Sequence, residues 1–356
     1  MELGYVGLGA MGGALARRLM LSHKLRVLDL RPEAVAAFAE NGAIPAQDGA
    51  SLARESDIVL LCLPRSADVR EAIFGAGGLA EGLSPGKVVV DQTSGNPDDT
   101  RAMAAELAEQ GITLIDAPVS GGPAGADAGT IAIMVGGPQD AFAKVQPYLE
   151  SISPNIVHCG HIGNGHVVKL VNNTIAACNR LGMLEAVAMG RKYGLSLETM
   201  SDVINKSSGR SGATERLLPA MIAGEESSNF AMGLMLKDVS LATQLGLNCG
   251  APMFLHNVVR GLLQQGVYEH GGDAIGPLAR LLVEGAVELV GLELVVRLDA
   301  PDVARLRGVQ LQHEVVELVA ELLRERVCLG AVHTAIFLVE RRGALGARPL
   351  GSSRTD

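Results

Sequence analysis

Hydrophobic residues recur in the first half of the chain in short blocks separated by segments with helical periodicity. Blocks of strand length cover residues 3–6, 25–28, 57–64, 87–91, 112–116, 131–135 and 155–158. Helical patterns lie between them, among them 32–40, 68–74 and 97–110, the last introduced by Asn96 as N-cap and Pro97 in the first position. Nearly continuous apolar strands that alternate with helices are typical of a doubly wound α/β sheet covered on both faces.

From residue 165 onward the pattern becomes helical throughout. The sequence predicts helices at 165–192, 197–205, 215–222, 232–245, 253–265 and 278–289. Farther on, 302–307 and 313–326 have helical patterns, 329–339 fits a helix or a strand, and 344–356 has the composition of a disordered end. We therefore expect an α/β domain at 1–162, an all-helical domain at 163–290, and a partly helical C-terminal extension at 291–356. This extension is either an oligomerisation arm or a sequence unrelated to function.

A glycine-rich turn joins the first predicted strand to the first helix. It reads Gly7-Leu8-Gly9-Ala10-Met11-Gly12, and the next strand ends at Asp29. Gly7 permits a tight turn, Gly9 lets the backbone approach a pyrophosphate, and Gly12 lets the helix pack on the sheet. A strand, G-x-G-x-x-G, a helix, a strand and an acid within about thirty residues predict a Rossmann dinucleotide-binding domain.

The acid after the second strand bears on which dinucleotide binds. Asp29 stands where a carboxylate accepts hydrogen bonds from the adenosine ribose hydroxyls, which favours NAD and repels the 2′-phosphate of NADP. Arg31 is compatible with holding that phosphate, and equally with being a solvated residue before Pro32 at a helix start. We expect NAD as the cofactor, with NADP as the alternative.

Loops after the strands are the next candidates, because ligands of open α/β sheets bind at the carboxyl ends of strands. This rule places Leu63-Pro64, Asp68 and Thr93-Ser94 beside the dinucleotide. Farther on, Ser120-Gly121-Gly122 offers a hydroxyl and consecutive backbone N–H groups, an arrangement that suits a carboxylate. Taken alone, each segment also fits an ordinary loop or a glycine-rich turn.

The segment 165–192 combines a mostly apolar sequence with a few polar residues. Lys169, Asn172 and Asn173 stand at i, i+3 and i+4, so they project from one side of the predicted helix. Burying them is costly unless they meet a ligand or each other. We assign Asn173 to orienting a substrate or Lys169, and Asn172 to tying the helix to a loop. For His166 we expect a polar role at the helix start. The alternative is a lysine that reaches solvent beside two amides that hold a loop.

Composition argues against several classes of partner and site. Aromatic residues are 3% of the 356, Trp is absent and the net charge is −9, which argues against a nucleic-acid partner. No run of membrane-span length is free of charge, and the N-terminus lacks a basic export signal, so we expect a cytoplasmic protein. The five cysteines are scattered and no cluster has metal-ligand spacing, so we expect a metal-free site without disulfides.

Four motifs in this order resemble those of the β-hydroxyacid dehydrogenase family, over about residues 1–290. They are Gly7-Leu8-Gly9-Ala10-Met11-Gly12; Asp116-Ala117-Pro118-Val119-Ser120-Gly121-Gly122; Gly163-x-Gly165-x-x-x-Lys169-x-x-Asn172-Asn173; and Met235-Leu236-Lys237-Asp238-Val239-Ser240-Leu241-Ala242. The chain departs from the family twice. NADP-preferring members often have Asn-Arg-Thr where this chain has Asp29-Leu30-Arg31, and 291–356 matches nothing in the family.

The resemblance implies roles for particular residues. Lys169 matches the catalytic lysine, and the substrate-binding positions are Ser120, Gly121, Gly122 and Asn173. The matched cofactor contacts are Leu63, Pro64, Asp68, Ser94 and Lys237. An all-helical second domain and a homodimer or homotetramer are also implied.

These roles agree with the chemistry of a lysine on an apolar helix. An ordinary lysine, with a pKa of about 10.4, is a poor base at neutral pH, but an apolar wall and a positive nicotinamide ring both lower this pKa. We therefore expect an NAD(P)-dependent oxidoreductase that transfers a hydride between nicotinamide and a small 3-hydroxy acid or its semialdehyde or keto acid. Substrates of the 3-hydroxyisobutyrate, glycerate/tartronate semialdehyde and L-threonate types all remain open.

Two other functions fit a Rossmann fold followed by helices. An imine reductase has the same architecture, but such enzymes typically lack the helix lysine. A non-catalytic dinucleotide-binding scaffold would not require Lys169, Ser120 and Asn173, which are all present.

Overall fold

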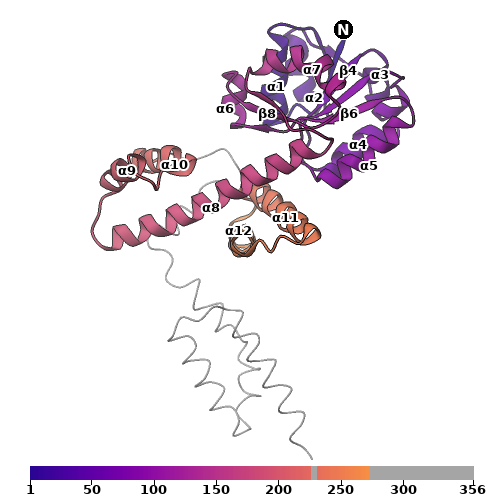
Figure 1. Cartoon of the computed structure of the whole chain (residues 1–356). Helices are drawn as coiled ribbons and strands as arrows, with labels where there is room; N and C mark the ends of the chain where they lie inside the picture. The colour runs from indigo at the N-terminus through magenta and orange to yellow at the C-terminus, as the bar shows by residue number, and fades with distance from the viewer. Residues whose placement is uncertain (226–230, 273–356) are drawn as a thin grey trace, which may run out of the picture. The chain divides into compact units, whose positions relative to one another are not determined.

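A parallel sheet organises the first part of the chain in the computed structural model, which describes residues 1–225 and 231–272 (Figure 1). Its strands lie in the order β3-β2-β1-β4-β5-β6, and every neighbouring pair is parallel. In chain order they are β1 (Leu3–Val6), β2 (Leu25–Leu28), β3 (Ile44–Pro45), β4 (Ile58–Leu61), β5 (Val88–Asp91) and β6 (Thr113–Asp116). The carboxyl ends of β1, β4, β5 and β6 therefore meet at one edge, where ligands of such sheets bind.

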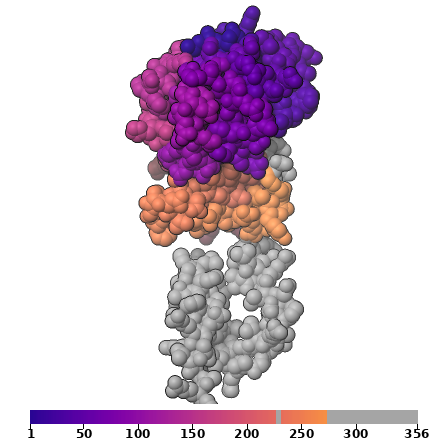
Figure 2. Space-filling model, turned by 90° about the vertical axis from the view of Figure 1, so that its right-hand side faces the viewer, coloured from indigo at the N-terminus to yellow at the C-terminus, as the bar shows by residue number. Residues whose placement is uncertain are grey.

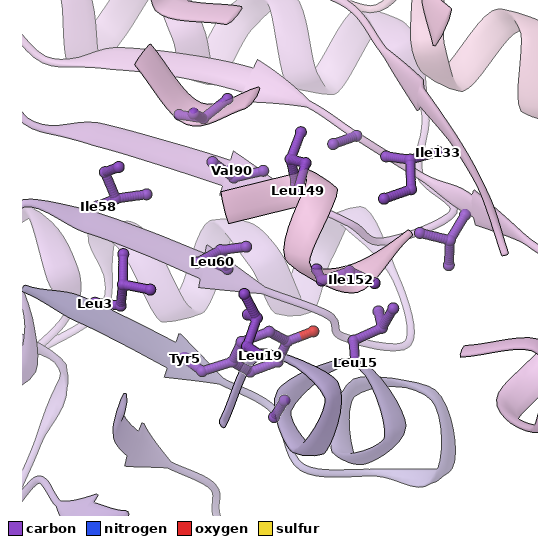
Figure 3. Packing of buried hydrophobic residues seen from close by; sticks show 14 of the residues in the cluster. Leu3, Tyr5, Leu15, Leu19, Ile58, Leu60, Val90, Ile133, Leu149 and Ile152 are labelled. Atoms are coloured by element: carbon purple, nitrogen blue, oxygen red, sulfur yellow. The ribbon is translucent and has the colours of Figure 1, made fainter. Parts of the chain in front are cut away.

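Helices cover both faces of this sheet. They are α1 (Ala10–Met20), α2 (Pro32–Glu40), α3 (Gly49–Arg54), α4 (Ser66–Phe74), α5 (Pro97–Ala108) and α7 (Gln139–Ile152), with a short 3-10 turn, η1 (Leu79–Glu81). Successive strand residues point to opposite faces, so Leu60 packs in a core with α1 and α7 whereas Val59 and Leu61 pack with α3, α4 and α5. Figure 3 shows the first core, where Tyr5 and Leu60 lie near Leu15 of α1. This arrangement confirms the predicted doubly wound α/β fold.

The later strands differ from the prediction that they complete the same sheet. Strands β7 (Val119–Ser120), β8 (Ala132–Val135) and β9 (Ile156–His158) form a separate three-stranded sheet in the order β7-β8-β9. Strand β7 runs antiparallel to β8, and a single bridge between Asp116 and Gly136 connects this sheet to β6. The turn through Gly121 and Gly122 reverses the chain into the short helix α6 (Gly122–Asp127), which the sequence did not predict.

One long helix, α8 (Asn164–Lys192), begins the helical part, close to the predicted 165–192. Four helices pack on it: α9 (Leu197–Asn205), α10 (Gly212–Ala223), α11 (Met232–Cys249) and α12 (Phe254–His270). Helices α9 and α10 share one apolar cluster with α8, and α11 and α12 share another. Figure 2 shows the outer surface of α11 and α12 in orange. The predicted helices at 278–289, 302–307 and 313–326, the segment at 329–339 and the end at 344–356 lie outside the described residues.

Helix α8 buries its lysine and exposes several of its apolar side chains. Lys169 is buried, with 7% of its surface exposed, whereas Val168, Val171 and Ile175 are 41%, 52% and 51% exposed. The helix therefore presents an apolar stripe outward and turns its lysine inward. No helix within 1–225 or 231–272 has the length and apolarity needed to cross a bilayer. The domain boundaries at 162 and 290 stay predictions.

Candidate active site

The glycine-rich turn has the shape that its sequence predicts. Gly7 has a φ of +93°, and a Cβ there would lie 2.4 Å from the carbonyl oxygen of Cys62, so only glycine fits. A Cβ on Gly12 would lie 2.0 Å from the carbonyl oxygen of Gly7, which explains how closely α1 approaches the turn. Gly9, in contrast, has no described atom within 4 Å of an added Cβ. Of the three glycines, Gly9 alone leaves open space, at the start of α1, and this fits a pyrophosphate bound on the helix N-terminus.

Asp29 follows β2 and faces this turn. Its Oδ2 accepts a hydrogen bond of 2.6 Å from the backbone N–H of Leu8, while Oδ1 accepts from the backbone N–H of Arg31 at 2.9 Å. The Arg31 guanidinium also donates to both carboxylate oxygens. Burial acts to raise the pKa of Asp29, but the hydrogen bonds from Arg31 and Leu8 and the arginine charge outweigh it and lower this pKa. Asp29 is therefore ionised at neutral pH.

The predicted cofactor loops come together at the edge of the sheet. The backbone N–H of Leu63 donates to Oγ1 of Thr93, which links the loop after β4 to the loop after β5. Lys237, on α11, donates through Nζ to the carbonyl oxygens of Pro64 at 3.1 Å and of Ser94 at 2.5 Å. Asp68, in the first turn of α4, instead forms an ion pair with Arg65.

The predicted substrate loop is fixed to α8 by an amide. Nδ2 of Asn172 donates to Oγ of Ser120 at 3.2 Å and to Oδ1 of Asn173 at 3.1 Å. This contact is the loop tie that we assigned to Asn172. Gly121 and Gly122, which follow Ser120, have φ values of +145° and +72°, backbone conformations that favour glycine.

The side chain of Lys169 is buried, and burial changes the acidity of its amine. Its Nζ has no hydrogen bond to any residue within 1–225 or 231–272. Burial lowers its pKa from 10.5 to about 8. The charge of Asp238 raises this pKa and that of Lys237 lowers it, so these two charges oppose each other. An amine with a pKa near 8 exchanges protons readily at neutral pH.

Asn173 connects Lys169's helix to α11. Its Nδ2 donates to Oδ2 of Asp238 at 2.5 Å, and Oδ1 of Asp238 lies 3.4 Å from Nζ of Lys237. Asp238 is 2% exposed, and Oδ1 has no hydrogen bond to the described residues. The polar contacts thus run from Ser120 through Asn172, Asn173 and Asp238 to Lys237.

The first turn of α8 is anchored on the end of β6. Asp116 is fully buried, and its carboxylate accepts hydrogen bonds from the backbone N–H of Gly163 at 2.6 Å and of His166 at 2.8 Å. Desolvation raises the pKa of Asp116, against the effect of His166 and the two backbone donors. Because Lys169 lies one turn beyond His166, this anchor fixes where its side chain starts.

Sequence reasoning did not assign Asp116, Asp91 or Asp238 to the site. A signal for the first two was present: each is an acid that ends a buried apolar strand. Asp238 belongs to the fourth motif but received no role. Among the described residues, no group of three or more His, Cys, Asp or Glu side chains is arranged to hold a metal ion.

Two family models match nearly all the described part of the chain. Residues 2–160 match the NAD-binding domain of 6-phosphogluconate dehydrogenase, and residues 163–276 match the NAD-binding domain of NADP-dependent 3-hydroxyisobutyrate dehydrogenase. The cofactor is accordingly NAD or NADP.

Named relatives agree with these models. The chain is 40% identical to 2-(hydroxymethyl)glutarate dehydrogenase of Eubacterium barkeri, over 77% of this chain and 90% of that protein. It is 36% identical to 3-hydroxyisobutyrate dehydrogenase of Pseudomonas aeruginosa, over 68% and 84% respectively. The structure of Mycobacterium tuberculosis 3-hydroxyisobutyrate dehydrogenase with L-serine matches with a TM-score of 0.73 and 28% identity, covering 79% of this chain and 99% of that one. The chain therefore belongs to the β-hydroxyacid dehydrogenase family of NAD(P)-dependent oxidoreductases acting on CH–OH groups.

Proposed function

We propose that this protein oxidises the primary alcohol of a small 3-hydroxy acid, with Lys169 as the general acid and base. The single observation that carries the proposal is the buried amine. Lys169 is 7% exposed, has no hydrogen bond to the described residues, and has a pKa lowered by burial to about 8. A lysine with a purely structural role would instead be paired with an acid or another buried acceptor.

The proton passes through Nζ of Lys169. In the oxidising direction the neutral amine accepts the hydroxyl proton of the substrate, and in the reducing direction the charged amine polarises the carbonyl and returns that proton. Burial lowers the pKa of this amine, against the charge of Asp238 and together with that of Lys237, and so brings its two protonation states close in free energy near neutral pH.

The substrate carboxylate is assigned to Ser120, Gly121 and Gly122, with Asn173 orienting the substrate. The contact between Asn172 and Ser120 supports this assignment, because it holds the loop against the same helix that carries Lys169. A carboxylate at this loop and a hydroxyl at Nζ define the two ends of a short substrate.

The open position at Gly9, the N-terminus of α1 and the position of Asp29 fit a dinucleotide, and we propose NAD rather than NADP. Gly7, Leu8, Gly9, Ala10, Met11 and Gly12 would hold its pyrophosphate, and Asp29 its ribose. Contacts to the rest of it are assigned to Leu63, Pro64, Asp68, Thr93, Ser94 and Lys237. When bound, the dinucleotide supplies the nicotinamide carbon that accepts or returns the hydride.

The names of two relatives narrow the substrate class. 3-Hydroxyisobutyrate and 2-(hydroxymethyl)glutarate each carry a hydroxymethyl group on the carbon that bears a carboxylate. We propose the shared unit HOCH2–CH(R)–COO⁻ as the substrate, in which R distinguishes the acids. Glycerate contains this unit, whereas L-threonate does not.

A panel of acids tests the proposal. The protein is assayed for NADH and NADPH formation with 3-hydroxyisobutyrate, 2-(hydroxymethyl)glutarate, glycerate and L-threonate, and for reduction of cyclic imines. We expect turnover with one or more acids that contain the unit. Turnover of imines alone would favour an imine reductase, and dinucleotide binding without any turnover would favour a scaffold.

The substitution Lys169→Ala tests the proposed role of this lysine. General acid–base catalysis typically contributes about 10²–10⁴-fold, so kcat should fall by that factor while the Kd for NADH stays nearly unchanged. Lys192→Ala, at the exposed end of the same helix, is the control and should keep wild-type turnover. Retained turnover in Lys169→Ala would overturn the assignment.

We also propose a cytoplasmic homodimer or homotetramer. The exposed stripe of Val168, Val171 and Ile175 on α8 supports self-association, because an apolar helix face is normally covered. Light scattering of the full chain, together with Ile175→Glu, tests it: the variant should lower the molar mass, and a monomeric wild type would contradict the proposal.

A further inference from the structure

A buried group of three titratable side chains lies under the candidate site and has no role in the mechanism above. Asp91 ends β5, Asp116 ends β6, and His166 lies in the first turn of α8. Their exposures are 1%, 0% and 0%. Asp91 and Asp116 are register partners on neighbouring parallel strands, so their side chains leave the same face of the sheet.

Two carboxylates side by side in a buried place repel each other, and both lose the solvation that water provides. Backbone donors compensate in part. Asp91 accepts from the N–H of Thr93 at 2.9 Å, and Asp116 accepts from those of Gly163 and His166. These donors carry no net charge, so a nearby cation is needed if both acids are to ionise.

The His166 ring is in the right place to supply that cation. Its Nε2 lies 3.5 Å from Oδ2 of Asp91, and no other basic side chain within 1–225 and 231–272 approaches either carboxylate within 4 Å. Neither ring nitrogen has a hydrogen-bond partner in that part of the chain. A neutral imidazole would leave these nitrogens and two like charges uncompensated. A charged ring adds an attraction to each carboxylate, and these attractions offset the one repulsion between the two acids.

We propose that His166 is held as an imidazolium beside Asp91 and near Asp116, and that this charge positions Lys169 against the cofactor loop. His166 is thus a positioning residue for the reaction, an inference that rests on the proposed function of Lys169.

The contacts around the ring explain how the effect reaches the site. Lys169 follows His166 by one helical turn, so a shift of the ring displaces the amine. On the other side, Asp91 holds the N–H of Thr93, and a Cβ on Gly95 would lie 3.4 Å from Nε2 of His166. The imidazolium therefore connects the start of α8 to the loop of Thr93 and Ser94.

Other charged groups surround the cluster. The Cys62 thiol, at the end of β4, interacts with Asp91, and on the α5 side Arg101 donates to the carbonyl oxygen of Ile162 and is already paired with Asp98. Lys169 on α8 and Lys237 on α11 also act on the Cys62 thiol, and they lower its pKa against the effects of burial and Asp91.

Charge balance gives the test. His166→Gln keeps a hydrogen-bonding side chain but removes the positive charge. The net charge of the cluster then changes from −1 to −2. Asp91→Asn combined with His166→Gln restores one net negative charge. We expect kcat to fall about tenfold or more in His166→Gln, in the range of misplaced catalytic groups, with the Kd for NADH within about threefold.

The double variant should recover most of the lost kcat. His161→Gln, an exposed histidine in the turn before α8, is the control and should match the wild type. Wild-type kcat in His166→Gln, or a double variant more impaired than His166→Gln, would overturn the positioning role by charge.

A second readout does not depend on turnover. NMR of the full chain labelled with ¹⁵N in histidine, with His166 assigned through the His166→Gln variant, should show both ring nitrogens protonated at pH 7. A single neutral tautomer would overturn the inference. A wild-type protein that turns over none of the acids, yet shows this imidazolium, would count against the proposed function and leave the buried charge established.

Discussion

Lys169 occupies a position that a purely structural lysine would not favour. Its neighbours on α8, Val168 and Val171, are more exposed than the lysine itself. Turning the charged side chain inward costs solvation, and this cost appears as a pKa of about 8. The same property that destabilises the fold makes the amine a competent proton acceptor at neutral pH.

The lowered pKa predicts opposite pH dependences for the two directions of the reaction. Oxidation needs the neutral amine, so its kcat/KM should rise with pH and level off above about 8. Reduction needs the charged amine and should fall as pH rises through the same value. Initial rates in both directions between pH 6 and 10 measure this, and parallel profiles would contradict the assignment of Lys169.

The lowered pKa of Lys169 also predicts how the stability of the fold changes with pH. The pKa of Lys169 is about 8 in the folded chain and 10.5 in its ordinary state. At pH values between these two, Lys169 binds a proton in the unfolded chain but not in the folded one, so the free energy of unfolding should rise with pH in this range. Below both pKa values Lys169 is charged in the folded chain as well, so the full free-energy cost of burying the cation is present. Lys169→Met should therefore stabilise the fold at pH 7 by roughly 1–3 kcal/mol and flatten the dependence. Urea unfolding at pH 7 and pH 9.5 provides the comparison.

Arg31 gives a prediction about the choice of dinucleotide. Its guanidinium donates to both oxygens of Asp29 at the end of β2. If Asp29 selects NAD, Arg31→Ala should leave the Kd for NAD within about threefold, because the carboxylate keeps its hydrogen bond to the N–H of Leu8. Any NADP binding should weaken by about tenfold or more, since a phosphate would lose a charge-assisted bond. Fluorescence titration with NADH and NADPH checks it, and stronger NADPH binding in the variant would refute the reasoning.

At the scale of elements, the start of α8 packs closely against β8 and the end of β6. A Cβ on Gly165 would lie 2.3 Å from the carbonyl oxygen of Met134 and 2.7 Å from Oδ2 of Asp116. Gly165→Ala should therefore destabilise the fold by about 2–4 kcal/mol and lower kcat, because it pushes the helix off its anchor. Urea unfolding and initial rates measure the two effects.

Gly182, in the same helix, is the matched control. It is exposed, and no described atom lies within 4 Å of an added Cβ. Gly182→Ala should stabilise the fold by about 0.5–1 kcal/mol, the ordinary preference of a helix for alanine, with unchanged kcat. Equal effects of the two substitutions would show that the start of α8 is not tightly packed.

Helical periodicity and end signals were sufficient to predict the long elements. Helix α9 covers the predicted 197–205, because Ser196 caps it through the N–H of Thr199. Helix α3 was missed although Asp48 and Ser51 form a capping box, since six residues give too little periodicity. The second sheet was missed because an apolar strand pattern reports burial and not the partner strand.

The candidate site was predictable in its residues but not in its contacts. Lys169, Ser120 and Lys237 follow from motifs. However, the bonds from Asn172 to Ser120 and from Asn173 to Asp238 join residues 52 and 65 positions apart. Such long-range pairs depend on how the elements pack, which local patterns do not encode. The exposure of the α8 stripe and the burial of His166 were hidden for the same reason.

At the scale of the whole described chain, Lys237 joins two parts that are distant in sequence. It leaves α11 and donates to carbonyl oxygens that follow β4 and β5, 173 and 143 residues earlier. Its neighbour Asp238 binds Asn173 of α8. One turn of α11 thereby contacts the candidate cofactor loops and the helix of the candidate base, so cofactor binding and the position of Lys169 should depend on each other.

Lys237→Met tests this dependence. The variant keeps roughly the length of the side chain but loses both hydrogen bonds to the backbone, each worth about 1.5–3 kcal/mol when the donor is charged. We expect the Kd for NADH to rise by about tenfold, and amide hydrogen exchange to increase around residues 63–66 and 93–96. Lys192→Met, at the exposed end of α8, should change neither. If NADH bound Lys237→Met as tightly as wild type and exchange stayed the same, the lysine would be dispensable for cofactor binding, and this dependence would be refuted.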